Sequence, residues 1–97
     1  MENKEKIKIE IEKEILISGL NLILQDLRTR YKYYSKESNL LKQQREETTK
    51  EIIKIGFLIL KYGFKLNEEL IPSKSIIEDI KWKYKKYQNG KQNNKIN

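Results

Sequence analysis

The sequence predicts an all-α fold: an antiparallel hairpin of two long helices plus a third, C-terminal helix, forming a three-helix up-down-up bundle, with a dimer left open. Two observations support this. Apolar side chains recur at alternating three- and four-residue steps in three separate segments. The apolar stretches 15–24 and 52–60 also lie at mirrored positions about a polar turn near residues 35–38. A chain of 97 residues is long enough for one domain with a thin core.

The first helical segment carries two apolar stripes. One stripe is a coiled-coil-like seam, which consists of Ile17, Leu20, Leu24, Leu27, Tyr31 and Tyr34. The second lies on roughly the opposite side at ~100° per residue and consists of Ile7, Ile11, Ile15 and Leu22. A helix that is apolar on two sides must be covered twice, so the third helix, a second copy in a possible homodimer or a target protein is expected to cover the surplus apolar surface, and the second stripe supplies the residues assigned to self-association. Alternation over residues 6–12 is also compatible with a β-strand, and the sequence leaves this alternative open.

The second segment is expected to run from a cap at Ser35 or Ser38 to about Tyr62. Its seam comprises Leu41, Thr48, Ile52, Ile55, Ile59 and Tyr62, with Arg45 at the one polar step. Gly63 is placed to end this helix in a left-handed turn. If the two helices fold back on one another, residues whose numbers add up to about 75 lie level. Gly19 is then expected to meet Gly56 and to let the two backbones approach closely.

The third segment follows the connector 65–72, and Pro72 marks its start. Ser75 and Glu78 have the spacing of a capping box. The expected seam is Ile77, Ile80, Tyr84 and Tyr87, and Asn89-Gly90 is expected to end the helix. We therefore divide the chain into a frayed N-terminus (1–5), a single helical domain (6–88) and a disordered basic tail (89–97).

The formal net charge of +7 is concentrated in two segments that contain no acid. Segment 28–36 and segment 80–97 both interleave cations with aromatic rings, whereas the other residues hold 11 basic and 14 acidic side chains. In an up-down-up bundle, the ends of the first and third helices lie at the same pole, so the two segments are expected to merge there. The residues assigned to binding a nucleic acid or a protein partner are Arg28, Arg30, Lys32, Tyr33, Lys81, Trp82, Lys83, Lys85 and Lys86.

A simpler explanation of these cations also stays open. Cations in the last turn of a helix offset the helix dipole, and lysine stems cover apolar surface while the ammonium group stays in water. Trp82 lies ~180° round from the seam of its helix. It is either a binding platform or a ring covered by the connector, by the first helix or by a second subunit.

The composition argues against an enzyme. The chain has no cysteine, which excludes disulfides and thiolate metal sites, and no histidine, which removes the usual general base and the commonest zinc ligand. No phosphate-binding loop or hydrolase motif occurs. Glu10/Glu14 and Glu47/Glu51 are spaced to share a helix face, but solvated surface explains them better than a magnesium site. We expect no cofactor, no metal and no small-molecule substrate.

Location and membrane behaviour follow from the apolar stretches. Both are about half the ~20 residues that a bilayer span requires, and no signal-peptide layout is present. The expectation is a cytoplasmic protein without membrane attachment.

Two functions are consistent with these features. The first is a small basic, non-enzymatic helical protein that binds single-stranded DNA or RNA through a cationic, aromatic pole. The second is a protein–protein interaction module, a regulator or inhibitor of a host or nucleic-acid-processing protein, encoded by a phage, plasmid or other mobile element. In that case the cationic end would meet an acidic protein surface.

Overall fold

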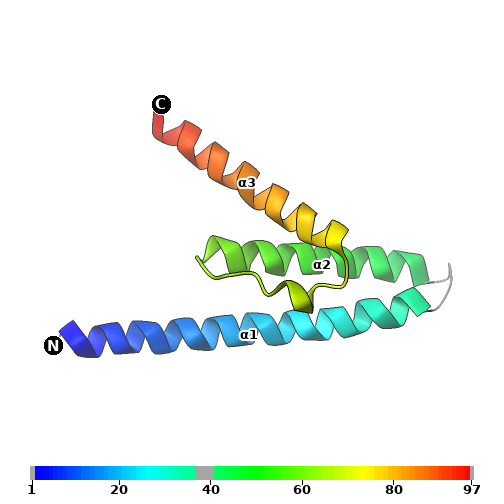
Figure 1. Cartoon of the computed structure of the whole chain (residues 1–97), viewed down its shortest axis with the longest axis horizontal. Helices are drawn as coiled ribbons and strands as arrows, with labels where there is room; N and C mark the ends of the chain where they lie inside the picture. The colour runs from blue at the N-terminus through cyan, green and yellow to red at the C-terminus, as the bar shows by residue number, and fades with distance from the viewer. Residues whose placement is uncertain (1, 37–40, 97) are drawn as a thin grey trace.

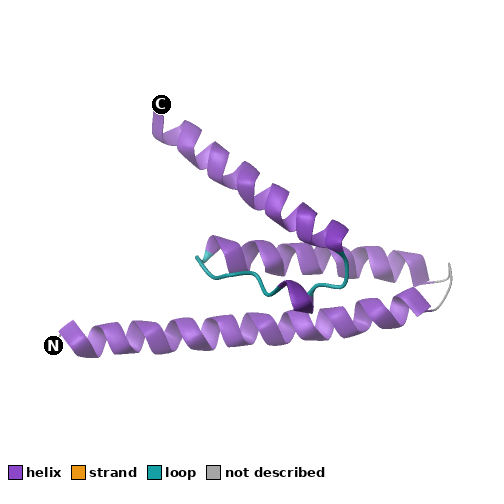
Figure 2. Ribbon diagram, viewed as in Figure 1, coloured by secondary structure: helices purple, strands orange, loops and turns teal. Residues whose placement is uncertain are grey.

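Three α-helices make up nearly all of the described chain. The computed structural model describes residues 2–36 and 41–96, with side-chain surroundings for residues 4–36 and 41–90. The elements are α1 (Glu2–Lys36), α2 (Lys42–Lys61), a short 3-10 helix η2 (Glu68–Leu70) and α3 (Lys74–Ile96) (Figures 1 and 2). No strand occurs among the described residues, and 6–12 are helical. The all-α class, with a hairpin and a third helix, is confirmed.

α1 and α2 form the predicted antiparallel hairpin, and most of the predicted seam lies inside it. Tyr62 was wrongly placed in this seam, because it caps the C-terminal end of α2 and is 53% exposed. Leu20, Leu24 and Leu27 of α1 are buried against Ile52 and Ile59 of α2. Thr48 is also buried. Its hydroxyl group is satisfied there, because it donates a hydrogen bond of 2.7 Å to the Gln44 carbonyl one turn earlier. Ile17 and Tyr31 pack at the edge of this core.

The ends of α2 are only partly as predicted. Gly63 takes the predicted left-handed conformation, with φ of 86°. The Gly63 amide donates to the Leu60 carbonyl and the Phe64 amide to the Ile59 carbonyl, a Schellman ending that satisfies the last carbonyls of α2. The Ser35 cap at the other end was wrong, because Ser35 belongs to α1 and donates to the Tyr31 carbonyl at 2.8 Å. The alternative cap, Ser38, lies outside the described residues.

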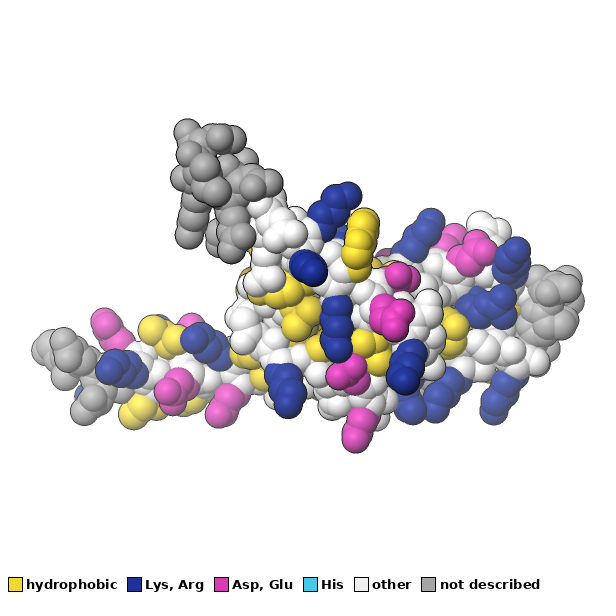
Figure 3. Space-filling model, turned by 45° about the horizontal axis from the view of Figure 1, so that its top comes forward, with side chains coloured by type: hydrophobic (Ala, Val, Ile, Leu, Met, Phe, Trp, Pro, Cys, Tyr) yellow, Lys and Arg dark blue, Asp and Glu magenta, His cyan; other side chains and the backbone are white. Residues whose placement is uncertain are grey.

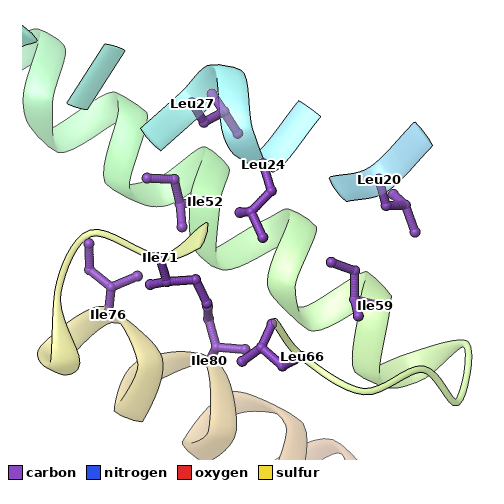
Figure 4. Close-up of a cluster of buried hydrophobic side chains, with 9 residues drawn as sticks. All are labelled: Leu20, Leu24, Leu27, Ile52, Ile59, Leu66, Ile71, Ile76 and Ile80. Carbon is purple, nitrogen blue, oxygen red and sulfur yellow. The ribbon is translucent and has the colours of Figure 1, made fainter. Parts of the chain in front are cut away.

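The connector between α2 and α3 is part of the core, although the sequence pattern gave no indication of this. It runs back along the hairpin and inserts two buried side chains, Leu66 and Ile71. Asn67 shapes this path, since its side-chain oxygen accepts a hydrogen bond from the Glu69 amide at the start of η2. Figure 4 shows that the buried cluster draws on α1, α2, the connector and α3 together.

α3 begins one residue after Ser73, not at the predicted Ser75 cap. The Ser73 hydroxyl accepts a hydrogen bond from the Ser75 amide at 3.2 Å, so Ser73 caps the helix. Ile80 of the predicted seam is fully buried, but its neighbour Ile76 is buried as well and was not predicted. α3 continues through Asn89-Gly90, where its end was expected, to Ile96. The division into a domain of residues 6–88 with loose ends stays a prediction.

The direction of α3 separates the two cationic segments. Because the connector provides the return leg, α3 runs back in the same sense as α2 and diverges from it (Figure 1). The C-terminal end of α1 lies beside the start of α2, whereas the C-terminal end of α3 lies at the other side of the molecule. The expectation that segments 28–36 and 80–97 merge at one pole was therefore wrong.

The expected contact between Gly19 and Gly56 was also wrong. Gly56 is buried under α3, where an added Cβ would meet Ile80 Cδ1 at 2.5 Å. At Gly19 an added Cβ would have nothing within 4 Å. The close approach that a glycine allows is thus between α2 and α3, and not between α1 and α2.

Candidate nucleic-acid interface on the third helix

The outward side of α3 carries an exposed aromatic ring among cations. Trp82 is 64% exposed, so the described part of the chain does not enclose it. Lys86, one turn later, holds its Nζ 4.9 Å from the centre of the indole ring, a cation–π contact. Trp82, Lys85, Lys86 and Asn89 line a shallow pocket of about 320 Å³. These four residues are called the Trp82 face below.

The Trp82 face follows from how α3 is anchored. Ile76 and Ile80 are buried, and at ~100° per residue Trp82 lies ~200° from Ile80. Burial of one side of α3 therefore turns the indole to solvent. Asn89, which the sequence analysis missed, lies seven residues after Trp82, and this two-turn spacing is a signal that could have identified it.

Two further lysines of α3, Lys81 and Lys83, flank this face in different surroundings. Lys81 forms an exposed ion pair with Glu68 of η2 at 3.3 Å. Lys83 holds its Nζ 5.2 Å from the ring centre of Phe57 on α2. Lys85 and Lys86 are thus the two cations next to the indole, while Lys81 and Lys83 lie toward the body of the protein.

Tyr84 and Tyr87 serve packing in the described structure. Their rings form an aromatic cluster with Phe57, with ring centres 5.5 to 6.4 Å apart. This cluster fastens the middle of α3 to α2, so the Trp82 face is presented by a supported helix.

The predicted residues of the first cationic segment lie apart from this face. Arg30 is engaged in an ion pair with Asp26 at 2.9 Å. Arg28 is half-buried, and its Nε has no hydrogen-bond partner among the described residues. Lys32 is exposed, and Tyr33 is 60% exposed with its ring edge-on to Tyr34. These residues lie at the turn end of the hairpin, away from the C-terminal half of α3 (Figure 1).

The predicted self-association residues lie on one uncovered side of α1. Ile7, Ile11, Ile15 and Leu22 are 51 to 67% exposed. Ile11, Ile15 and Leu22 line a shallow groove together with Glu14, Ser18 and Gly19. Figure 3 shows apolar side chains exposed along the part of α1 that extends beyond the hairpin. The four predicted residues are called the α1 outer face below.

A polar groove between α1 and α2 is a further concave feature of the described residues. It has a volume of about 280 Å³ and is lined by Leu27, Arg30, Tyr34, Gln44, Glu47, Thr48 and Glu51. Glu47 and Glu51 do share a face here, as their spacing predicted. Within the described ranges, however, no group of three or more metal-ligating side chains occurs.

None of the helices in the described ranges has both the length and the apolar character that a bilayer crossing requires. No protein-family model, no curated protein and no solved structure matches this chain.

Proposed function

We propose that this protein binds single-stranded nucleic acid through the Trp82 face. The observation that carries the proposal is an indole left 64% exposed on a helix in which four lysines and no acid follow Asp79 up to Lys86. An exposed ring offers a stacking surface for a base, and lysines beside it neutralise the phosphates on either side.

The geometry of Lys86 suggests how binding proceeds. In the free protein, its ammonium group lies over the indole ring. A base that stacks on this ring takes the place of the ammonium group, which then moves the short distance to a flanking phosphate. Lys85 supplies a second phosphate contact from the same side of α3. A cation–π contact is thereby exchanged for base stacking plus a charge-assisted contact.

Single strands fit this face better than a duplex. The stacking surface is one flat ring, and a base reaches it only when its own face is exposed, as in single strands and RNA loops. No sequence-specific readout is implied, since stacking accepts every base. Arg28, Arg30, Lys32 and Tyr33 lie apart from this face, near the turn end of the hairpin, so only a longer strand would reach them.

The test uses the fact that Trp82 is the chain's one tryptophan. Titration with oligothymidine should quench its fluorescence, because the base stacks directly on the indole. Affinity should fall with salt with a log–log slope of roughly −0.7 per phosphate contact. Lys85→Gln with Lys86→Gln should reduce the magnitude of this slope by about 1.4, whereas the matched pair Lys6→Gln with Lys13→Gln on α1 should reduce affinity less.

A second variant separates stacking from charge. Trp82→Leu leaves every cation in place and should weaken binding of a labelled oligonucleotide by about tenfold, with the salt slope unchanged. Unquenched fluorescence at low salt, or equal loss in the two double-lysine variants, would show that the Trp82 face is not the binding site.

The α1 outer face favours a second candidate function, a protein–protein interaction module that regulates or inhibits another protein. An exposed apolar stripe of this kind is typical of an interaction surface. This candidate gains support if the α1 outer face binds a protein and if no oligonucleotide changes the fluorescence emission of Trp82. An origin in a phage, plasmid or other mobile element, and a cytoplasmic location, stay predictions.

A further inference from the structure

α1 is much longer than the helix that covers it. It spans 35 residues and α2 spans 20, so the N-terminal part of α1 extends past the end of the hairpin (Figure 1). Every residue from 4 to 16 is exposed, including Ile7, Ile9, Ile11 and Ile15. A lone helix of this length is marginal in water without a packing partner. Packing against a further surface would therefore stabilise the extension.

The apolar side of this helix is continuous with the hairpin. At ~100° per residue, the four residues of the α1 outer face fall within an arc of about 80°, and Gly19 borders the arc. Each of these residues is half to two-thirds exposed, and together they leave roughly 400 Å² of apolar surface, within the size range of the largest patch on a typical monomer, which is often functional. The stripe starts on the extension and ends at Leu22, within the hairpin.

We propose that a second copy of this chain covers the α1 outer face, with the two α1 helices packed antiparallel. In a twofold pair the same patch serves both partners, so the patch must complement itself. Ile15 and Gly19 do so: an isoleucine protrudes one turn before a glycine with open space above it. With the axis level with residue 17, Ile15 of each copy lies over Gly19 of the other.

The same register matches the rest of the stripe. Ile11 of one copy then lies beside Leu22 of the other, on the opposite flank from the Ile15–Gly19 contact. Lys8 lies level with Asp26, which already pairs with Arg30 of its own chain, so at each end of the pair a lysine joins this existing ion pair. The extension of each copy also rests along the hairpin of the other, which supplies the surface that the extension lacks. This pairing is independent of nucleic-acid binding.

The mass of the protein in solution tests the proposal. Sedimentation equilibrium across a concentration series should show a monomer–dimer equilibrium for the full chain. Ile15→Lys should raise the dissociation constant at least tenfold. Gly19→Leu should do the same, although it adds apolar surface, because the leucine fills the space that Ile15 of the other copy occupies. Since nothing lies within 4 Å of a Cβ at Gly19, the monomer should keep its circular dichroism spectrum.

The register has its own test, because the chain has no cysteine. When chains carrying Ile15→Cys are mixed with chains carrying Gly19→Cys and oxidised, a disulfide should form between the two variants. It should form faster in this mixture than in a sample that contains only one of the variants. A monomeric mass at all concentrations would overturn the proposal. So would tighter association of Gly19→Leu, which would indicate non-specific apolar contact, or cross-linking that is no faster in the mixture.

Discussion

Two glycines show how surroundings decide the effect of a residue. Gly19 and Gly56 both lie inside helices, where glycine lowers helix stability by ~1 kcal/mol relative to alanine. The sequence predicted the presence of both helices but not what covers each glycine, because a hairpin seam does not specify the path of a third element. Gly56 makes room for Ile80, whose Cδ1, Cγ1 and Cγ2 would all come within 3.1 Å of an added Cβ.

Gly56→Ala and Gly19→Ala should therefore change stability in opposite directions. Gly56→Ala should lower the free energy of unfolding by about 1–2 kcal/mol, because overpacking against the buried Ile80 outweighs the gain in helix propensity. Gly19→Ala should raise it by about 0.5–1 kcal/mol, measured by urea unfolding at a concentration where the chain is monomeric. Equal effects of the two substitutions would contradict the packing of α3 on Gly56.

The helices were predictable as elements, whereas their ends and the connector were not. Spacing of leucine and isoleucine identifies a buried side over many turns, so the buried centre of the α1 and α2 seams is the one predicted, whereas Tyr62 at the end of α2 is 53% exposed. A cap depends on a single hydrogen bond, and both Ser73 and Ser75 precede the apolar run of α3. Leu66 and Ile71 lie in a segment without helical periodicity, so nothing in the pattern indicated that they are buried.

Two serine substitutions test where α3 begins. Ser73→Ala removes the side chain that accepts the Ser75 amide and should lower the free energy of unfolding by ~1 kcal/mol. Ser75→Ala should leave it nearly unchanged, because Ser75 is an exposed residue of the first turn and its amide, not its hydroxyl, makes the contact. The two denaturation curves, recorded side by side, decide between the caps. A larger loss in Ser75→Ala would restore the capping box that the sequence predicted.

The molecule as a whole has a compact centre and two projecting helical ends. Its extents of 57 × 36 × 17 Å reflect the N-terminal part of α1 and the C-terminal half of α3, which both leave the hairpin. Of the candidate site, the sequence indicated that Trp82 lies on the side of its helix opposite the seam, but it left open whether the ring is exposed or covered. It could not predict the separation of the two cationic segments, because that depends on which way the connector runs.

The rate of amide hydrogen exchange should differ between the compact centre and the projecting N-terminal part of α1. Amides around Leu24, Ile52 and Ile59 should exchange slowest, since opening them disrupts the whole core. In the monomer, residues 4–16 should exchange orders of magnitude faster, and they should become protected as the protein concentration rises and a second copy covers them. Uniform protection along α1 in dilute solution would show that the extension is stable without a partner.

The path of the connector also bears on the order in which the chain folds. The hairpin joins neighbours in sequence and can form quickly from local contacts. Ile80 of α3 packs in the same buried cluster as Leu66 and Ile71 (Figure 4). The surface that α3 packs against is therefore incomplete until the connector has packed on the hairpin. Attachment of the loop and of the last helix is thus expected to be one concerted late event, in which the tryptophan-bearing arm takes up its final orientation.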